Sequence, residues 1–154
     1  MFDVKMLENS KLVAKKFMAN NGIKCAKLLP IESPAFPQVM KFDCRCNGQA
    51  VKVLYNNEEK NQFARKFPGI RYFLEEYLPG YEICVKSTWV DGKVTAFSSL
   101  THVNAEMNEK LNSNLHLLER AFKNEQINFN GDLRIHFIFN AGELYTIKYR
   151  VFPN

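Results

Sequence analysis

Three short turn signals, each set between strand-like runs, constrain this chain more than any other feature of its sequence. The signals are Asn47-Gly48, Asp91-Gly92 and Asn140-Ala141-Gly142. The runs that flank them cover residues 38–46 and 49–55, 81–90 and 93–103, and 133–139 and 143–152. Asn-Gly and Asp-Gly favour two-residue hairpin turns, because both central residues of such a turn take positive φ. The sequence therefore predicts antiparallel hairpins, the first two of them with tight turns.

Helical patterns separate these hairpins. Apolar side chains recur at helical spacing over residues 7–21 and 58–67. The clearest pattern covers residues 107–122, where the apolar positions follow one another at steps of 4, 4, 3 and 4. Helices set around antiparallel strands predict an α+β fold in two lobes, at about 1–72 and 73–154.

Size and charge narrow the possible partners. The chain has 154 residues, with 21 Lys and Arg against 16 Asp and Glu, which gives a net charge of +5. The cations are scattered and no run of five or six like charges occurs, which argues against a nucleic-acid partner. No apolar run approaches the ~20 residues of a membrane-spanning helix, and no signal-peptide pattern is seen. We therefore expect a single cytoplasmic domain with no membrane partner.

Three segments in order resemble the ATP-grasp family, most specifically the ATP-grasp region of phosphoribosylamine–glycine ligase. They are residues 8–18 with Asn21-Gly22-Ile23, residues 73–82 with Val90-Asp91-Gly92-Lys93, and residues 131–137 with 142–150. The first matches the family's pattern of Glu, Ser-Lys, Ala-Lys, Phe-Met and Gly-Ile. The second is similar to its hinge strand, and the third to its last, metal-holding hairpin. The resemblance covers nearly the whole chain and implies two α+β lobes of ATP-grasp type.

The resemblance also implies nucleotide-binding residues. Lys41 matches a lysine that contacts the phosphates, a task that suits a compact charge on a flexible stem; an exposed surface lysine is the alternative. Glu82 matches the carboxylate that accepts hydrogen bonds from the ribose hydroxyls; a solvated strand end is the alternative. The hinge, whose backbone pairs with adenine, corresponds to Glu75, Glu76, Tyr77 and Leu78.

The last strand departs from the family pattern. ATP-grasp enzymes carry Glu-x-Asn there as magnesium ligands, whereas this chain has Lys148-Tyr149-Arg150, and His136 stands at another ligand position. Lys and Arg offer no acceptor atoms, so the sequence argues against magnesium and against any metal site. Either Lys148 and Arg150 meet the phosphates directly, or they are ordinary strand residues. We assign no catalytic residue.

Two further departures concern the rest of the ligase. The family's mobile, glycine-rich phosphate lid corresponds to residues 44–49, which hold one glycine and predict a tight hairpin instead. The domains that flank the family's ATP-grasp region have no counterpart in the chain.

These departures favour a degenerate, stand-alone ATP-grasp domain without ligase activity. It would act by binding a protein partner or a second copy of itself, by binding ATP or another nucleotide without magnesium, or by both. The alternative is an active ATP-dependent carboxylate–amine ligase of purine biosynthesis type, completed by another chain. A nucleic-acid binder is a third reading, which predicts a steep dependence of affinity on salt.

Overall fold

The computed structural model describes residues 2–45 and 48–154. Its helices are α1 (Val4–Asn9), α2 (Lys11–Asn20), α3 (Asn57–Ala64) and α4 (Ala105–Asn124). Its strands are β1 (Leu28–Leu29), β2 (Gln38–Phe42), β3 (Val51–Leu54), β4 (Tyr72–Glu76), β5 (Tyr81–Val90), β6 (Lys93–Ser99), β7 (Gly131–Asn140) and β8 (Glu143–Pro153). Within the described ranges, no helix combines the length and the apolar character needed to cross a membrane.

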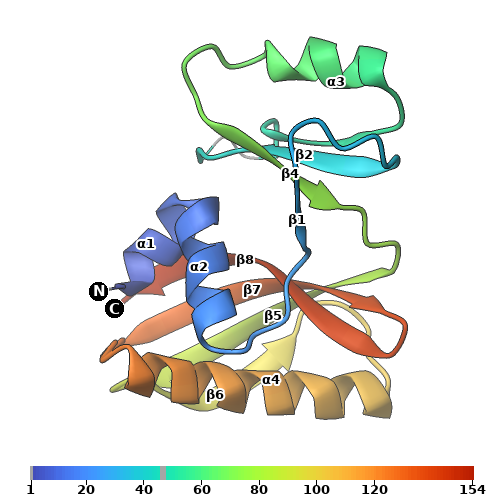
Figure 1. Ribbon diagram of the computed structural model, residues 1–154. Helices are drawn as coiled ribbons and strands as arrows, with labels where there is room; N and C mark the ends of the chain where they lie inside the picture. Colours follow the sequence, from blue (N-terminus) through green and yellow to red (C-terminus); the bar gives the residue numbers. More distant parts are fainter. Residues whose placement is uncertain (1, 46–47) are drawn as a thin grey trace. The chain divides into compact units, whose positions relative to one another are not determined.

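The strands form two antiparallel sheets (Figure 1). Sheet A has the order β1-β4-β2-β3, and sheet B has the order β6-β5-β7-β8. Each sheet is accompanied by helices, so the α+β fold in two lobes that the sequence predicts is confirmed.

The chain divides into two compact units. Unit 1 comprises Met1–Cys25 and Pro79–Asn154, and unit 2 comprises Ala26–Leu78. This division differs from the lobes expected at 1–72 and 73–154, because the first two helices belong with sheet B and β4 belongs with sheet A. The reason is local: α1 and α2 bury their apolar side chains in the core of sheet B, while β4 pairs with β1 and β2.

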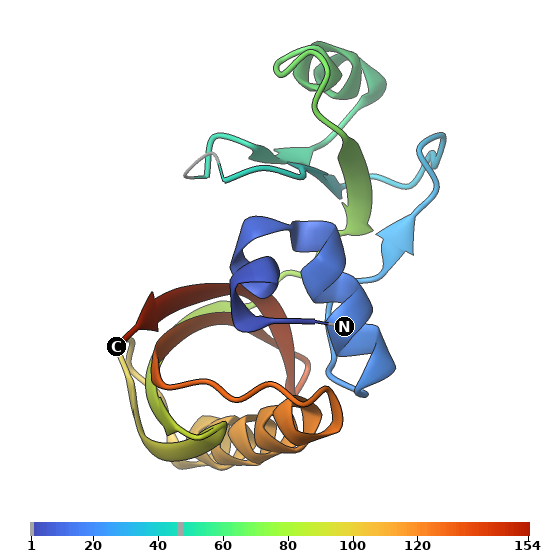
Figure 2. The ribbon, with the colours of Figure 1, turned by 90° about the vertical axis from the view of Figure 1, so that its left-hand side faces the viewer.

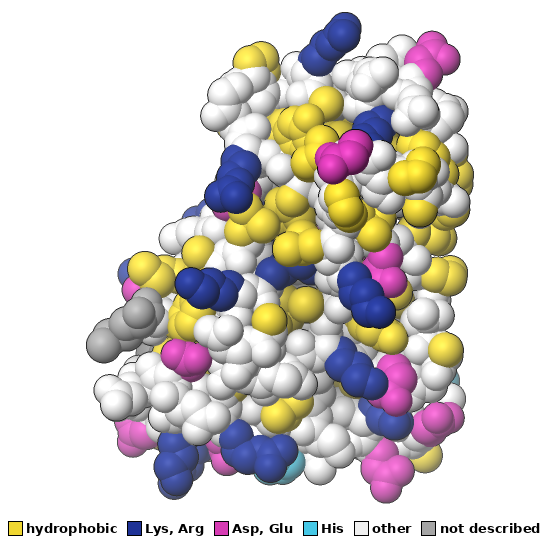
Figure 3. Space-filling model, viewed as in Figure 1, with side chains coloured by type: hydrophobic (Ala, Val, Ile, Leu, Met, Phe, Trp, Pro, Cys, Tyr) yellow, Lys and Arg dark blue, Asp and Glu magenta, His cyan; other side chains and the backbone are white. Residues whose placement is uncertain are grey.

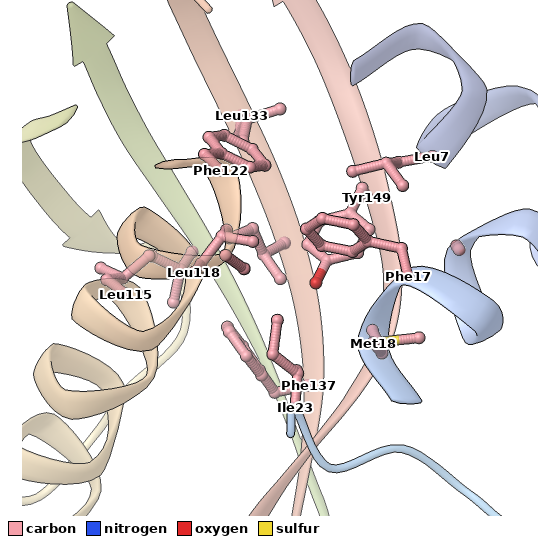
Figure 4. Packing of buried hydrophobic residues seen from close by; sticks show 14 of the residues in the cluster. Leu7, Phe17, Met18, Ile23, Leu115, Leu118, Phe122, Leu133, Phe137 and Tyr149 are labelled. Atoms are coloured by element: carbon pink, nitrogen blue, oxygen red, sulfur yellow. The ribbon is translucent and has the colours of Figure 1, made fainter. Parts of the chain in front are cut away.

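The core of unit 1 lies between sheet B and its three helices. In Figure 2 the strands of sheet B curve around this core, with α1, α2 and α4 on the inner side of the curve. Figure 4 shows Phe17 of α2 beside Tyr149 of β8, and their ring centroids are 6.4 Å apart. From α4, Phe122 stacks at a tilt on Trp89, with 4.9 Å between centroids. All four side chains are almost completely buried, which excludes water from this face of the sheet.

A smaller core holds unit 2 together. Phe42 is fully buried between sheet A and α3. Its ring contacts those of Phe63, Phe67 and Tyr72 at centroid distances of 5.5, 5.0 and 5.5 Å. Edge-on and tilted contacts of this kind add to the free energy gained by burial. On the face drawn in Figure 3, hydrophobic side chains lie close together over unit 2.

The N-terminal helix expected over 7–21 is two helices. Ser10 interrupts it with extended backbone, since it ends α1 and its Oγ accepts a hydrogen bond (3.2 Å) from the Val13 N–H at the start of α2. Serine is a preferred residue at this N-terminal position of a helix. From α1, the Glu8 carboxylate accepts a hydrogen bond from the Val151 N–H of β8. This contact caps part of an edge strand whose backbone would otherwise face solvent.

The tight turn predicted at Asn47-Gly48 does not fit the strands beside it. A two-residue turn there would pair residue 44 with Val51, but the ladder pairs Lys41 with Val51. The connection from Phe42 to Val51 is therefore longer than a two-residue hairpin. Cys46 and Asn47, on which the turn prediction falls, lie outside the described residues. The predicted tight turn had argued against a mobile phosphate lid in this segment. The observed strand register removes that argument.

Candidate functional site

In unit 2, the structure brings together two of the predicted residues, Lys41 of β2 and Glu75 of β4. Val39 pairs with Glu75, so Lys41, two residues further along β2, lies diagonally next to Glu75 on the same face of sheet A. The Lys41 Nζ is 2.6 Å from the Glu75 Oε1. Only 11% of the lysine side chain and 3% of the glutamate side chain are exposed. The lysine is therefore half of a buried ion pair rather than an exposed surface residue.

The surroundings of this pair are apolar. Strand alternation and register place Phe73, Val51 and Val53 on the same face of sheet A as Lys41 and Glu75. Phe73 is buried, while Val51 is partly exposed. Water screens a charge pair weakly when it is buried beside apolar side chains, so this attraction is stronger than that of an exposed pair.

The remaining hinge residues have different environments. Glu76 is half-buried on the other face of β4, and its Oε1 accepts a hydrogen bond (3.0 Å) from the Lys27 N–H. The Glu76 N–H donates to the Lys27 carbonyl oxygen at 2.9 Å. Tyr77 is exposed and Leu78 is half-buried after the end of β4. Both the backbone N–H and one carboxylate oxygen of Glu76 are therefore engaged with Lys27.

In unit 1, the structure gathers basic side chains on the face of sheet B that points away from the core. Lys86 of β5 pairs with Arg134 of β7, which pairs with Arg150 of β8, so three cations lie in one row across three strands. The adjacent row runs from Cys84 through His136 to Lys148. The four cations are exposed. We call Lys86, Arg134, Lys148 and Arg150 the cationic face.

A β-bulge sets this arrangement. Phe137 pairs with Thr146, whereas His136 pairs with Lys148, which leaves Ile147 as an extra residue in β8. Side chains alternate between the faces of a strand, so one extra residue exchanges the faces of all those that follow. The bulge thus turns Tyr149 into the core and Lys148 outward.

Acidic groups counter only part of the positive charge. Asp132 lies 3.3 Å from Lys86 Nζ and accepts a hydrogen bond from the Thr88 hydroxyl at 2.9 Å. That hydrogen bond, with the charge of Lys86, holds the pKa of Asp132 below its ordinary value. Within the described part of the chain, Arg134, Lys148 and Arg150 form no ion pair. The cationic face therefore keeps three positive charges that have no carboxylate in ion-pair contact.

The pKa of His136 is affected by these positive charges. Its Nε2 lies 3.7 Å from the Sγ of Cys84 and the imidazole is half-buried. Burial first, and then the charges of Lys148 and Arg150, lower the pKa of His136 below its ordinary value of 6.5, while Glu82 acts in the opposite direction. The imidazole is therefore neutral at neutral pH. Glu82 is exposed near the start of β5, in register with Ile138 of β7.

Among the predicted residues, Glu82, Lys148 and Arg150 share one face of unit 1, and Lys41 and Glu75 share one face of unit 2. Sequence reasoning missed Lys86 and Arg134. The alternation of apolar and polar residues in β5 indicates that Lys86 points away from the core. Its alignment with Arg134 and Arg150 depends on the pairing of three strands, which the sequence does not reveal. In the described ranges, no group of three or more His, Cys, Asp or Glu side chains is arranged to hold a metal ion.

Comparison with known proteins identifies the fold. No protein-family model matches the chain, and neither does any curated protein sequence. A phosphoribosylamine–glycine ligase from Thermotoga maritima superposes with a TM-score of 0.79 at 20% identity, over 94% of this chain and 48% of that one. The ADP complex of an N5-carboxyaminoimidazole ribonucleotide synthetase gives 0.73 at 17% identity, over 96% and 46%. A D-alanine–D-alanine ligase from Helicobacter pylori gives 0.70 at 15% identity, over 94% and 51%.

The chain spans about half the length of these solved structures. At such identities the likeness concerns the fold and not the activity. The resemblance found in the sequence is confirmed at that level: this chain has the fold of the ATP-grasp ligases.

Proposed function

We propose that this chain binds ATP or another nucleotide through its polyphosphate, without magnesium, and does not catalyse ligation. The observation that carries the proposal is the cationic face, where Lys148 and Arg150 stand without carboxylate partners in the described structure. Arginine forks and lysine ammonium groups both bind phosphate oxygens directly. The neutral imidazole of His136 would add a hydrogen bond at the same place.

The side chains at the implied metal positions do not fit magnesium. Magnesium requires oxygen ligands in a near-octahedral arrangement, and Lys148 and Arg150 supply none. A unit positive charge 4 Å away would repel each charge of the ion by about 4 kcal/mol at an effective dielectric constant of 20. The ligand set that the resemblance implies is therefore replaced here by cations.

The proposal concerns unit 1 and keeps there the role expected of Glu82, whose carboxylate would accept hydrogen bonds from the ribose.

Calorimetric titration of ATP tests the proposal, with one series in EDTA and one in excess magnesium. We expect binding in EDTA that magnesium does not strengthen, and no formation of ADP with amine and carboxylate substrates. The double variant Lys148→Ala/Arg150→Ala should weaken binding at least about tenfold, since it removes two charge-assisted contacts. The matched control, Lys16→Ala/Lys123→Ala, removes the same charge from exposed helix positions and should bind as the wild type does.

An active ligase completed by another chain is the second candidate. It is favoured by the solved structures with this fold, which are ligases and about twice as long. It predicts the opposite result: binding that depends strictly on magnesium, and ADP formation when the missing chain is added. Either observation would reject the magnesium-independent proposal.

A further inference from the structure

Unit 1 has a second basic site, a hollow of about 280 Å³ on the side of sheet B where α4 packs. One stripe of α4, the segment after α2 and the first residues of β8 form its walls. The residues that line it are Gly22, Lys24, Lys110, Ser113, Asn114, Leu117, Arg120, Glu143 and Leu144. None of them belongs to the cationic face, whose side chains project from the other side of the sheet.

The helix determines where the charges of this hollow lie. Lys110 and Arg120 are ten residues apart on α4, which corresponds to about 15 Å along the axis at 1.5 Å per residue. The two cations therefore stand toward opposite ends of the hollow, with Ser113, Asn114 and Leu117 between them. Within the described structure, neither Lys110 nor Arg120 forms an ion pair.

A third cation lies across from the helix. Lys24 Nζ is 3.0 Å from the Glu143 carboxylate, and both side chains are about half exposed. The hydrogen bond from Lys24, its charge and then the charge of Lys110 hold the pKa of Glu143 below its ordinary value. Lys110 thus acts on the same end of the hollow as Lys24. Three cations against one carboxylate leave two positive charges, one toward each end.

We propose that this hollow binds a metabolite-sized molecule with two anionic groups, one held by Lys24 and Lys110 and the other by Arg120. The volume of about 280 Å³ lies just below the roughly 300–1,000 Å³ of drug-sized ligand sites, which suits a small organic bisphosphate. Ser113 and Asn114 supply a hydroxyl and an amide for the polar middle of such a ligand, and Leu117 and Leu144 give it an apolar contact. This site is independent of the nucleotide proposed for the cationic face.

Nuclear magnetic resonance of the full chain, titrated at constant ionic strength, tests the site. The probes are fructose 1,6-bisphosphate and, as a ligand with one anionic group, fructose 6-phosphate. We expect the bisphosphate to bind more tightly and to shift the amide signals of Gly22, Ser113, Asn114 and Leu144. Shifts confined to Cys84, Arg134 and Arg150, equal affinity for the two probes, or no binding of either at millimolar concentration would overturn the proposal.

Three variants separate this site from the cationic face. Arg120→Ala should weaken binding of the bisphosphate at least about threefold, and Arg120→Lys should restore most of it. Glu143→Gln should strengthen binding at least about twofold, because it frees Lys24 from its carboxylate partner. Lys148→Ala/Arg150→Ala should leave bisphosphate binding unchanged, and Arg120→Ala should leave ATP binding unchanged, so each proposal fails or holds by itself. Unaltered affinity in both Arg120→Ala and Glu143→Gln, with wild-type melting temperatures, would reject the assignment.

Discussion

Arg134 and Arg150 lie directly opposite each other on β7 and β8, with their side chains on the same exposed face. Like charges in such cross-strand pairs destabilise a sheet. Lys86 extends the row on the other side of Arg134. The Arg134 guanidinium is also 5.1 Å from the centroid of the Phe152 ring, which holds it over an aromatic face. Along this row the sheet therefore carries positive charges at positions where its own stability would favour neutral residues.

The first prediction concerns the stability cost of that row. Arg150→Thr should raise the free energy of unfolding of unit 1 by about 0.5 kcal/mol at low salt, because it removes a like-charge neighbour and threonine suits a strand. The gain should shrink as salt screens the repulsion. Urea unfolding at low and high salt measures both the gain in stability and its dependence on salt. The probe is the fluorescence of Trp89, which is the one tryptophan of the chain and is buried in unit 1. A loss of stability that salt does not alter would mean that Arg150 is an ordinary packed strand residue.

The second prediction concerns the buried ion pair of unit 2. Lys41→Met should cost about 3–5 kcal/mol, because it removes the ammonium group that lies 2.6 Å from a carboxylate with only 3% of its side chain exposed. The double variant Lys41→Met/Glu75→Leu should recover most of that loss, since it removes both charges. Hydrogen exchange of the β2 and β4 amides is the suitable measurement, because Trp89 reports only on unit 1.

An exposed pair in unit 1 is the matched control for this prediction. Lys86 and Asp132 lie 3.3 Å apart, with 47% and 32% of their side chains exposed. Lys86→Met should therefore cost much less than Lys41→Met. Similar losses at both pairs would show that the Lys41–Glu75 pair is not effectively buried.

The third prediction is a pH dependence at His136. The lowered pKa of its imidazole means that the unfolded chain binds more protons than the folded chain just below pH 6.5. The free energy of unfolding should therefore fall as the pH drops through 6.5, and this contribution should level off below the folded pKa. His136→Gln should lack it. Lys148→Met should raise the pKa of His136, because it removes the strongest of the nearby positive charges. Titration of the imidazole carbon-bound protons by nuclear magnetic resonance gives the pKa directly, and a value at or above 6.5 would contradict the prediction.

The same titration connects His136 with the proposed nucleotide. A polyphosphate on the cationic face would offset the charges that depress the pKa of His136, so ATP should raise that pKa and should bind more tightly as the pH falls from 7 to 6. An unchanged pKa in saturating ATP would place the nucleotide elsewhere.

The sequence predicted most of the fold because hydrophobic periodicity and turn chemistry are local properties. The expected strand 81–90 is β5, and the helix over 107–122 lies within α4. One error is local: Ser10 splits the first helix because its side chain caps α2. The other depends on strand pairing: the β2–β3 ladder adopts a register that a tight turn at Asn47-Gly48 would not give.

The candidate site was less predictable for a related reason. Lys148 and Arg150 could be singled out from the sequence, but their side of the sheet depends on the bulge at Ile147, which no local pattern announces. Without that bulge the same alternation would turn them toward the core and Tyr149 outward. Lys86 and Arg134 join them only through the pairing of three strands, and the partner of Lys41 becomes visible only when β2 and β4 lie side by side.

The fourth prediction compares two hairpin glycines that share a backbone conformation but differ in their surroundings. Gly92 has a φ of 74° and Gly142 a φ of 79°, and each follows a residue that also has positive φ, Asp91 or Ala141. Gly142→Ala should cost about 1–2 kcal/mol for the left-handed backbone alone, since nothing lies within 4 Å of the added Cβ. Gly92→Ala should cost clearly more, because its Cβ would be 2.7 Å from the Ile127 carbonyl oxygen. Urea unfolding of both variants, followed by Trp89 fluorescence, gives the difference, and equal losses would mean that the segment around Ile127 yields without cost.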